Sequence, residues 1–90
     1  MLTLETTVQF RRDYKRMMKR GCSREKIEAV ISTLLAQSPL DAKYRDHELK
    51  GNYAGFRECH IQPDWLLIYR IDSGRLILTA ARTGTHADLF

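Results

Sequence analysis

The sequence is poor in cysteine, proline and glycine, and each shortage excludes a class of protein. Cys22 and Cys59 are the only cysteines among 90 residues, and they have neither CxxC spacing nor the ligand spacing of a zinc site. We expect both thiols to be reduced and Cys59 to be a small core residue. Because no Pro-, Gly- or Ser-rich stretch divides the chain, we predict one domain spanning residues 1–90.

Long apolar runs and familiar catalytic motifs are also absent. No stretch approaches the roughly 18 consecutive apolar residues that a membrane span needs, and MLTLETTVQF lacks the pattern of a signal peptide. We therefore expect a cytoplasmic protein without membrane contact. There is no P-loop, GxGxxG or GxSxG. His47, His60 and His86 are separated by 13 and 26 residues, which matches no compact zinc motif, so we expect no metal and no cofactor.

Positive charge, by contrast, is concentrated in one segment. The formal net charge is +4, but FRRDYKRMMKR alone carries six basic residues against Asp13. Such a run is often only the solvated face of a helix. Six cations against one acid exceed what solvation needs and favour an anionic partner, RNA rather than a membrane, although an acidic protein would also fit. The predicted RNA- or ribosome-binding residues are Arg11, Arg12, Lys15, Arg16, Lys19 and Arg20.

The spacing of apolar residues predicts the helices. Residues 2–5 alternate weakly and predict a short strand. Apolar residues at helical spacing predict a helix over residues 7–20, ended by Gly21. A second helix is predicted to begin at the capping residue Ser23 and to stop at Ser38-Pro39. The short GCS link between the two predicts an antiparallel helix hairpin.

After a polar connector, residues 41–51, the pattern becomes that of strands. GFRECHI, WLLIYRI and RLILTAA are β-prone runs separated by the turn sequences QPD and DSG. Connections this short predict an antiparallel meander. The second and third runs are apolar on both faces and should be central. The predicted fold class is α+β, with an N-terminal helix hairpin packed on a small antiparallel β-sheet, in the order (β)ααβββ with a short structured C-terminal tail. In that tail, Thr83-Gly84-Thr85 should form the turn after the last strand, and Leu89 should anchor the segment against the body.

Several side chains that can transfer protons fall near one predicted edge of this sheet. Strand alternation puts Glu58 and His60 on the face opposite Cys59, so that if Cys59 faces the helices, Glu58 and His60 face outward. Asp64 lies in the following turn, where it either caps the turn or orients the imidazole of His60 and raises its pKa. His86, just past the last strand, should reach the same edge. For each single histidine, an ordinary core or surface role remains the simpler interpretation.

The second half of the chain resembles a known family. YRDHELKGNYAGFRECHIQPDWLLIYR and RTGTHADLF resemble the YafQ branch of the RelE/ParE toxin superfamily, the ribosome-dependent mRNA interferases of bacterial type II toxin–antitoxin modules. The resemblance rests on the elements D-H-x-L-x-G, R-[DE]-x-H-[IV]-x-P-D-W and R-[TL]-G-[ST]-H-x-x-L-F. The N-terminal half agrees in length, helix pairing and charge but carries no motif.

This resemblance implies a helix hairpin on an antiparallel sheet and a metal-independent endoribonuclease. The family's reaction is cleavage of mRNA in the ribosomal A site, in which a ribose 2′-oxygen attacks the adjacent phosphate. It leaves a 2′,3′-cyclic phosphate and a free 5′-hydroxyl, and it needs a base, an acid and positive charge. The implied partners are a cognate antitoxin with an acidic binding segment, mRNA and ribosomal RNA, and the free toxin is expected to be a monomer.

The resemblance also implies roles for individual residues. The implied catalytic set is His47, His60, Asp64 and His86, with His60 and His86 as the acid/base pair in either order. Phe90 is expected to stack on an RNA base and Arg82 to stabilise phosphate charge. Glu58, also assigned to substrate binding, stands where other members have aspartate, one methylene shorter. The alternatives are a ParE-like toxin, or an RNA-binding module, without RNA cleavage.

Overall fold

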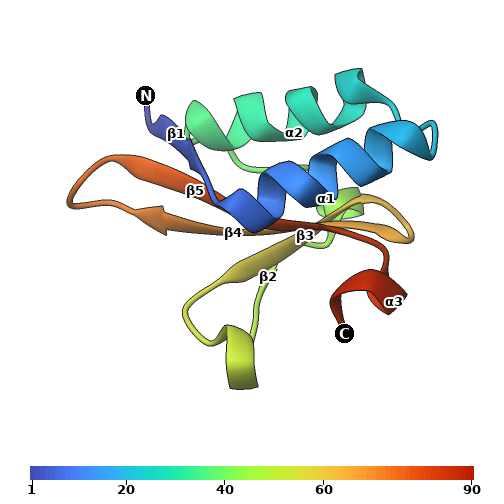
Figure 1. The fold of residues 1–90 in the computed structure, drawn as a ribbon. Coiled ribbons are helices and arrows are strands. Elements are labelled where there is room, and N and C mark those ends of the chain that lie inside the picture. The colour runs from blue at the N-terminus through green and yellow to red at the C-terminus, as the bar shows by residue number, and fades with distance from the viewer.

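A computed structural model describes all residues from 1 to 90 and consists of a five-stranded sheet with two long helices across one face (Figure 1). The strands lie in the order β1-β5-β4-β3-β2. Their bounds are β1 Thr3–Thr6, β2 His47–Glu48, β3 Arg57–Gln62, β4 Trp65–Asp72 and β5 Ile77–Gly84. The helices are α1 Val8–Lys19, α2 Arg24–Leu35 and a short α3 His86–Leu89, with 3-10 turns η1 Ala42–Tyr44 and η2 Gly51–Tyr53.

The helix hairpin is confirmed, and side-chain caps fix where its helices begin. The Thr7 hydroxyl accepts the Phe10 N–H at the start of α1, and the Ser23 hydroxyl accepts the Lys26 N–H at the start of α2. Gly21, in the left-handed region at φ +90°, follows α1 as predicted. The second helix ends at Leu35, before the predicted stop. None of the helices is long and apolar enough to cross a membrane.

The α+β class is confirmed, but the sheet is mixed rather than antiparallel. Strands β3, β4 and β5 form the predicted antiparallel meander with β4 and β5 in the interior. The first strand pairs with β5 in parallel. The sequence could not predict this direction, because most of the chain separates the two strands and no short turn links them. The sequence missed β2, which pairs antiparallel with β3; two polar residues show no period from which a strand could be predicted.

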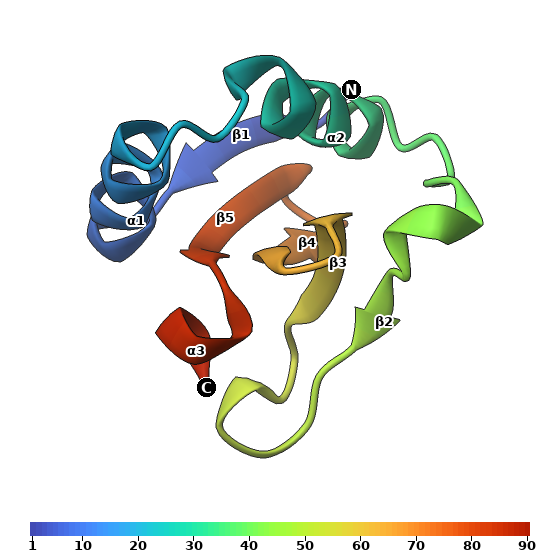
Figure 2. The ribbon, with the colours of Figure 1, turned by 90° about the vertical axis from the view of Figure 1, so that its right-hand side faces the viewer.

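Both faces of the sheet are covered, which explains why β4 and β5 are apolar on each side. The larger core lies between the sheet and the helices α1 and α2 and includes Met17, Ile27 and Leu67. A smaller cluster on the other face contains Leu66, Ile68, Ala81 and Leu89, with Leu49, Tyr53 and Phe56 packed against it. Figure 2 shows α3 and the segment between β2 and β3 on the side away from α1 and α2.

The C-terminal tail is structured, as predicted, and it forms a capped helix. Thr83 and Gly84, predicted to form the turn after the last strand, belong to β5, and α3 begins directly after Thr85. Thr85 and Asp88 form a capping box in which each side chain accepts the other's backbone N–H. A Cβ on Gly84 would lie 2.9 Å from that of Asp88, so this close approach needs glycine.

Candidate active site

The three histidines, far apart in the sequence, lie in a row. His47 comes from β2, His60 from β3 and His86 from the first residue of α3. The ring centroids of His47 and His60 are 6.2 Å apart, and those of His60 and His86 are 5.6 Å apart. Pairing of β2 with β3 sets His47 opposite Glu58. The expectation that His60 and His86 meet at one edge is confirmed, and the unpredicted β2 brings in His47.

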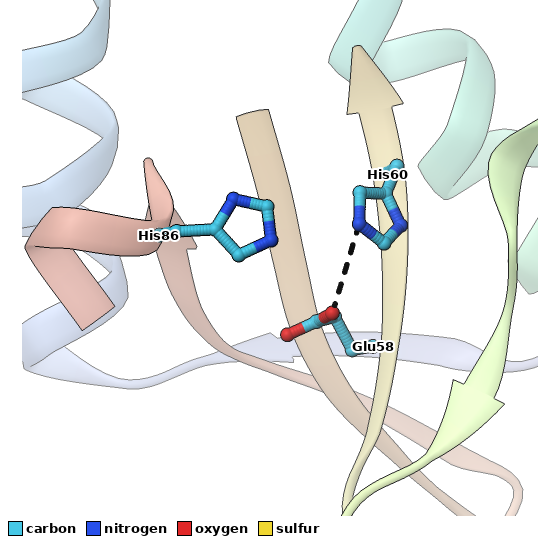
Figure 3. A group of neighbouring side chains, drawn as sticks. All are labelled: Glu58, His60 and His86. Carbon is cyan, nitrogen blue, oxygen red and sulfur yellow. Dashed lines mark ion pairs between the residues drawn. The ribbon is translucent and has the colours of Figure 1, made fainter. Parts of the chain in front are cut away.

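A buried carboxylate lies under this row. Glu58 is only 4% exposed, and its Oε1 is 3.5 Å from His47 Nε2 and 3.9 Å from His60 Nε2 (Figure 3). The alternation predicted for β3 is correct, because Cys59 lies in the core under the helices while Glu58 and His60 face the other way. The expected outward exposure of Glu58 is wrong, since the second apolar cluster covers that face. The Glu58 carboxylate therefore lies beside two imidazole rings.

Asp64 orients His86 rather than His60. Its Oδ1 lies 2.7 Å from His86 Nδ1 and also accepts the His86 backbone N–H at 3.0 Å. These two hydrogen bonds hold the pKa of the Asp64 carboxyl below its ordinary value. The predicted contact with His60 fails because the β3–β4 pairing shifts register after His60, and the turn that follows faces the start of α3. An Nδ1–H donated to Asp64 leaves Nε2 of His86 for a substrate proton.

The rings of the other two histidines are held differently. Nδ1 of His47 is 2.7 Å from the carbonyl oxygen of Arg45, and since a carbonyl only accepts, that nitrogen carries the proton. Arg45 itself is left-handed, at φ +51°, which a non-glycine residue adopts only when its surroundings impose it. Nδ1 of His60 is buried and has no hydrogen-bond partner.

The tail arginine is anchored by an acid that the sequence did not single out. Arg82 Nε lies 2.7 Å from Oδ2 of Asp13, which also accepts the Thr83 backbone N–H at 3.2 Å. Burial of Asp13 raises its pKa, but the hydrogen bonds from Arg82, Gln9 and Thr83 outweigh burial and lower it overall. Asp13 is fully buried, three residues after Phe10 on the apolar face of α1. An acid on the apolar face of the predicted helix was the signal from which its burial could have been predicted.

The predicted basic surface divides into two groups. Arg16 contacts Asp13 at 3.2 Å, Arg20 binds Asp88 of α3 at 2.6 Å, and Arg11 donates to Thr6. The exposed side chains of the second group make no ion pair or hydrogen bond within the chain; they are Arg12, Lys15 and Lys19. The basic helix therefore uses part of its charge to hold the tail and presents the rest to solvent.

The side chain of the terminal aromatic residue is largely exposed to solvent rather than buried in the core. Phe90 is 63% exposed, and its ring meets that of Tyr53 edge-on, with centroids 5.7 Å apart. Leu89, its neighbour, is buried and anchors the end of the chain, as expected. The Phe90 ring therefore packs against Tyr53 on one side and leaves most of its surface accessible to a ligand.

One group of side chains at this site could hold a metal ion. Glu58, His60 and His86 each offer one donor atom, and the three atoms lie within 4.8 Å of one another (Figure 3). One carboxylate with two imidazoles is a donor set that zinc and copper accept. The same nitrogens are those that an acid/base mechanism would use.

The fold and this site define a small α+β toxin-like domain, and comparison with known proteins places it. The family model described as "Bacterial toxin of type II toxin-antitoxin system, YafQ" matches residues 2–90. The mRNA interferase toxin YafQ of Escherichia coli K12 is 39% identical over 88 residues, 97% of this chain and 94% of that protein. The chain belongs to the YafQ family of type II toxins.

Two solved structures are similar over nearly the whole length. A metal-bound toxin from Helicobacter pylori has a TM-score of 0.94 and 42% identity, with 100% of both chains covered. The toxin chain of the E. coli DinJ-YafQ toxin-antitoxin complex has a TM-score of 0.89 and 38% identity, covering 99% of this chain and 97% of that one.

Proposed function

We propose that this chain is the toxin of a type II toxin–antitoxin pair and cleaves mRNA on the ribosome, with His60 and His86 as general acid and base. The observation that carries the proposal is the 5.6 Å separation of the two imidazole rings, one of them oriented by Asp64. The curated relative named an mRNA interferase supports the substrate class. Its action on ribosomes would put the protein in the cytoplasm.

The proposed reaction needs no external nucleophile. One imidazole removes the proton from a ribose 2′-hydroxyl, and the 2′-oxygen forms a bond to the adjacent phosphorus. The bond from phosphorus to the 5′-oxygen breaks, and the second imidazolium gives that oxygen a proton. The products are a 2′,3′-cyclic phosphate and a 5′-hydroxyl. Asp64 fixes the tautomer of His86, while the Glu58 carboxylate lies 3.9 Å from Nε2 of His60 and 3.5 Å from Nε2 of His47.

Substrate contacts are proposed on both sides of this pair. Arg82 is 24% exposed at its side chain, so it keeps surface for a phosphate oxygen while bound to Asp13. Phe90 stacks on a base, a contact worth about 1–3 kcal/mol in nucleic-acid sites. Ribosomal RNA binds the basic face of α1, chiefly through the unpaired residues Arg12, Lys15 and Lys19, with smaller contributions from Arg11, Arg16 and Arg20.

The proposed inhibitor is a cognate antitoxin. An E. coli relative is solved in a toxin–antitoxin complex with DinJ. The free basic side chains of α1 suit an acidic antitoxin segment that becomes ordered on contact. An antitoxin bound away from both α1 and the histidine row would contradict this mode of inhibition.

The reaction is proposed to be metal-independent, although H. pylori relatives are solved as metal-bound and copper-bound toxins. The residues that would hold an ion here are Glu58, His60 and His86. A bound ion would supply Lewis-acid charge, but it would occupy ring nitrogens that the proposed acid and base require. Toxin treated with EDTA and then desalted should therefore cleave mRNA on ribosomes as untreated toxin does, and a loss of cleavage after this treatment that added zinc restores would contradict the proposal.

Primer extension on mRNA after brief expression tests the activity. We expect discrete cuts in phase with codons that disappear when translation is blocked. His60→Ala and His86→Ala should each reduce cutting by about 10²–10⁴-fold, with Arg75→Ala, at the exposed β4–β5 turn, as the unaffected control. Growth inhibition without cuts would indicate a ParE-like action on a protein target. Folded histidine variants as inhibitory as the parent would overturn the mechanism.

A further inference from the structure

A cavity of about 680 Å³ opens beside the histidine row on the side away from α3. It lies between the start of α2, the η1 turn and the end of β3, and His60 forms part of its wall. The other residues used below are Lys26, Ala29, Lys43, Tyr44 and Arg45, which all line it. Its volume is within the range of small-molecule and cofactor sites.

The lining of this pocket is cationic. The lining contains one acid, Glu25, and three cations, Lys26, Lys43 and Arg45. None of the three cations forms an ion pair within the chain. The Lys43 ammonium lies 5.1 Å from the centre of the half-buried Tyr44 ring. Cations and an aromatic ring in one pocket are what single-stranded nucleic-acid sites present to phosphates and bases.

Two details connect the pocket to the histidine row. His60 directs Nε2 toward Glu58, and Figure 3 shows its other ring nitrogen on the side away from His86. His60 lines the pocket, and its buried Nδ1 has no hydrogen-bond partner within the chain. Arg45, which lines the pocket, holds a left-handed backbone, and its carbonyl positions His47. Such local strain is typical of functional segments.

We propose that this pocket binds the mRNA nucleotide that flanks the scissile phosphate on the His60 side. The proposal rests on the proposed function, and it extends the site beyond the histidine motifs to α2 and η1. Lys26, Lys43 and Arg45 bind the phosphate, Tyr44 contacts the base, and His60 Nδ1 bonds to the nucleotide. Because the cations contact the backbone, binding there is insensitive to base identity.

The test is an NMR titration of the ¹⁵N-labelled protein with a mixed-sequence RNA hexamer that is fully 2′-O-methylated and therefore cannot be cleaved. We expect amide shifts at residues 25–29, 43–45 and 60–62 and none at the β4–β5 turn. Lys26→Gln and Lys43→Gln should each raise Kd about three- to tenfold at low salt and reduce the salt slope by about 0.7. Arg75→Gln, which removes an exposed charge elsewhere, should leave both unchanged.

A pair of uncharged variants separates the cavity from its charge. Ala29→Trp fills the pocket from α2 and should abolish the shifts at residues 43–45. Ala36→Trp makes the same change at the exposed far end of α2 and should retain them. Both variants should keep the parent's melting temperature to within about 2 °C, since each site is exposed.

Each outcome bears on the proposal. Absence of shifts in the pocket at millimolar RNA, or shifts confined to α1, overturns it. Loss of antitoxin binding by Lys43→Gln without loss of RNA binding also overturns it and assigns the pocket to the antitoxin. If the parent protein gives no codon-phased cuts yet binds RNA in the pocket, the proposed cleavage is wrong, but the pocket is still an RNA-binding site. If the parent protein cleaves mRNA and the pocket variants bind RNA and cleave as it does, only the proposed RNA-binding role of the pocket is wrong.

Discussion

At the scale of single residues, the pair of Asp64 and His86 is the most consequential contact in the candidate site. Oδ1 of Asp64 accepts both from the ring and from the backbone N–H at the start of α3. One carboxylate therefore fixes the position and the tautomer of the imidazole. Both side chains are more than half exposed, at 66% for Asp64 and 54% for His86, so water weakens their attraction and geometry is the main contribution.

Asp64→Asn tests that contribution. The amide oxygen can still accept the His86 backbone N–H, so α3 should remain in place, but the amide cannot hold the imidazolium. We expect kcat/KM for cleavage to fall by about 10–100-fold, less than in a buried triad because this pair is exposed. Single-turnover cleavage on translating ribosomes gives the rate, and circular dichroism gives the fold. An unchanged rate would reduce Asp64 to a turn residue.

The residue identities could be predicted from the sequence better than their partners. The motif elements identified Asp64, Glu58 and the three histidines, and alternation along β3 correctly separated Glu58 from Cys59. The partner of Asp64 depends on a register shift after His60, which the sequence does not reveal. Burial of Glu58 depends on a second apolar cluster assembled from distant segments.

At the scale of elements, α3 is a four-residue helix that cannot be stable alone and is held from outside. Its Asp88 completes the capping box with Thr85 and binds Arg20, the C-cap residue of α1, through two oxygens, at 2.6 and 3.2 Å. The Arg20 guanidinium is the main reason that the pKa of Asp88 is strongly lowered. Since His86 is the first residue of α3, this contact also holds an acid/base candidate in place.

Asp88→Asn should loosen α3 without unfolding the protein. The change removes the ion pair and weakens the cap, a loss of about 1 kcal/mol in the range measured for helix caps. Amide exchange at residues 86–90 should accelerate while β4 stays protected, and cleavage should fall together with that protection. Asp72→Asn, at the turn between β4 and β5, is the matched control. Equal acceleration in β4 would mean that Asp88 supports the whole fold instead.

The limits of prediction at this scale follow from length and separation. Helices α1 and α2 carry a clear apolar period and capping residues, so their starts were predicted. Strand β2 is two polar residues long, and β1 pairs with a strand at the other end of the chain. The structured tail was predicted but its helix was not; this helix begins at a capping box of Thr85 and Asp88, where the end of a turn was expected.

At the scale of the whole molecule, buried and half-buried carboxylates tie the C-terminal segment to the body. Asp13 of α1 binds Arg82 of β5, and Asp88 of α3 binds Arg20, which directly follows α1. Both carboxyls have pKa values below the ordinary 3.8 in the folded protein and regain it on unfolding. Their stabilisation is therefore complete above pH 3.8 and is lost as the pH falls from there toward the folded pKa values.

Asp13→Asn should show how much of the acid sensitivity comes from the buried pair. The variant leaves Arg82 without its counter-charge, a loss of about 2–3 kcal/mol, reduced from the fully buried case because Arg82 keeps some exposure. Its melting temperature should be lower at pH 7 but should fall less than the parent's between pH 5 and pH 2. Glu5→Gln, an exposed carboxylate without an ion pair, should follow the parent's curve. If Asp13→Asn instead lost stability in parallel with the parent across this range, the acid response would belong to other carboxylates, and the link between α1 and β5 would be one of packing rather than charge.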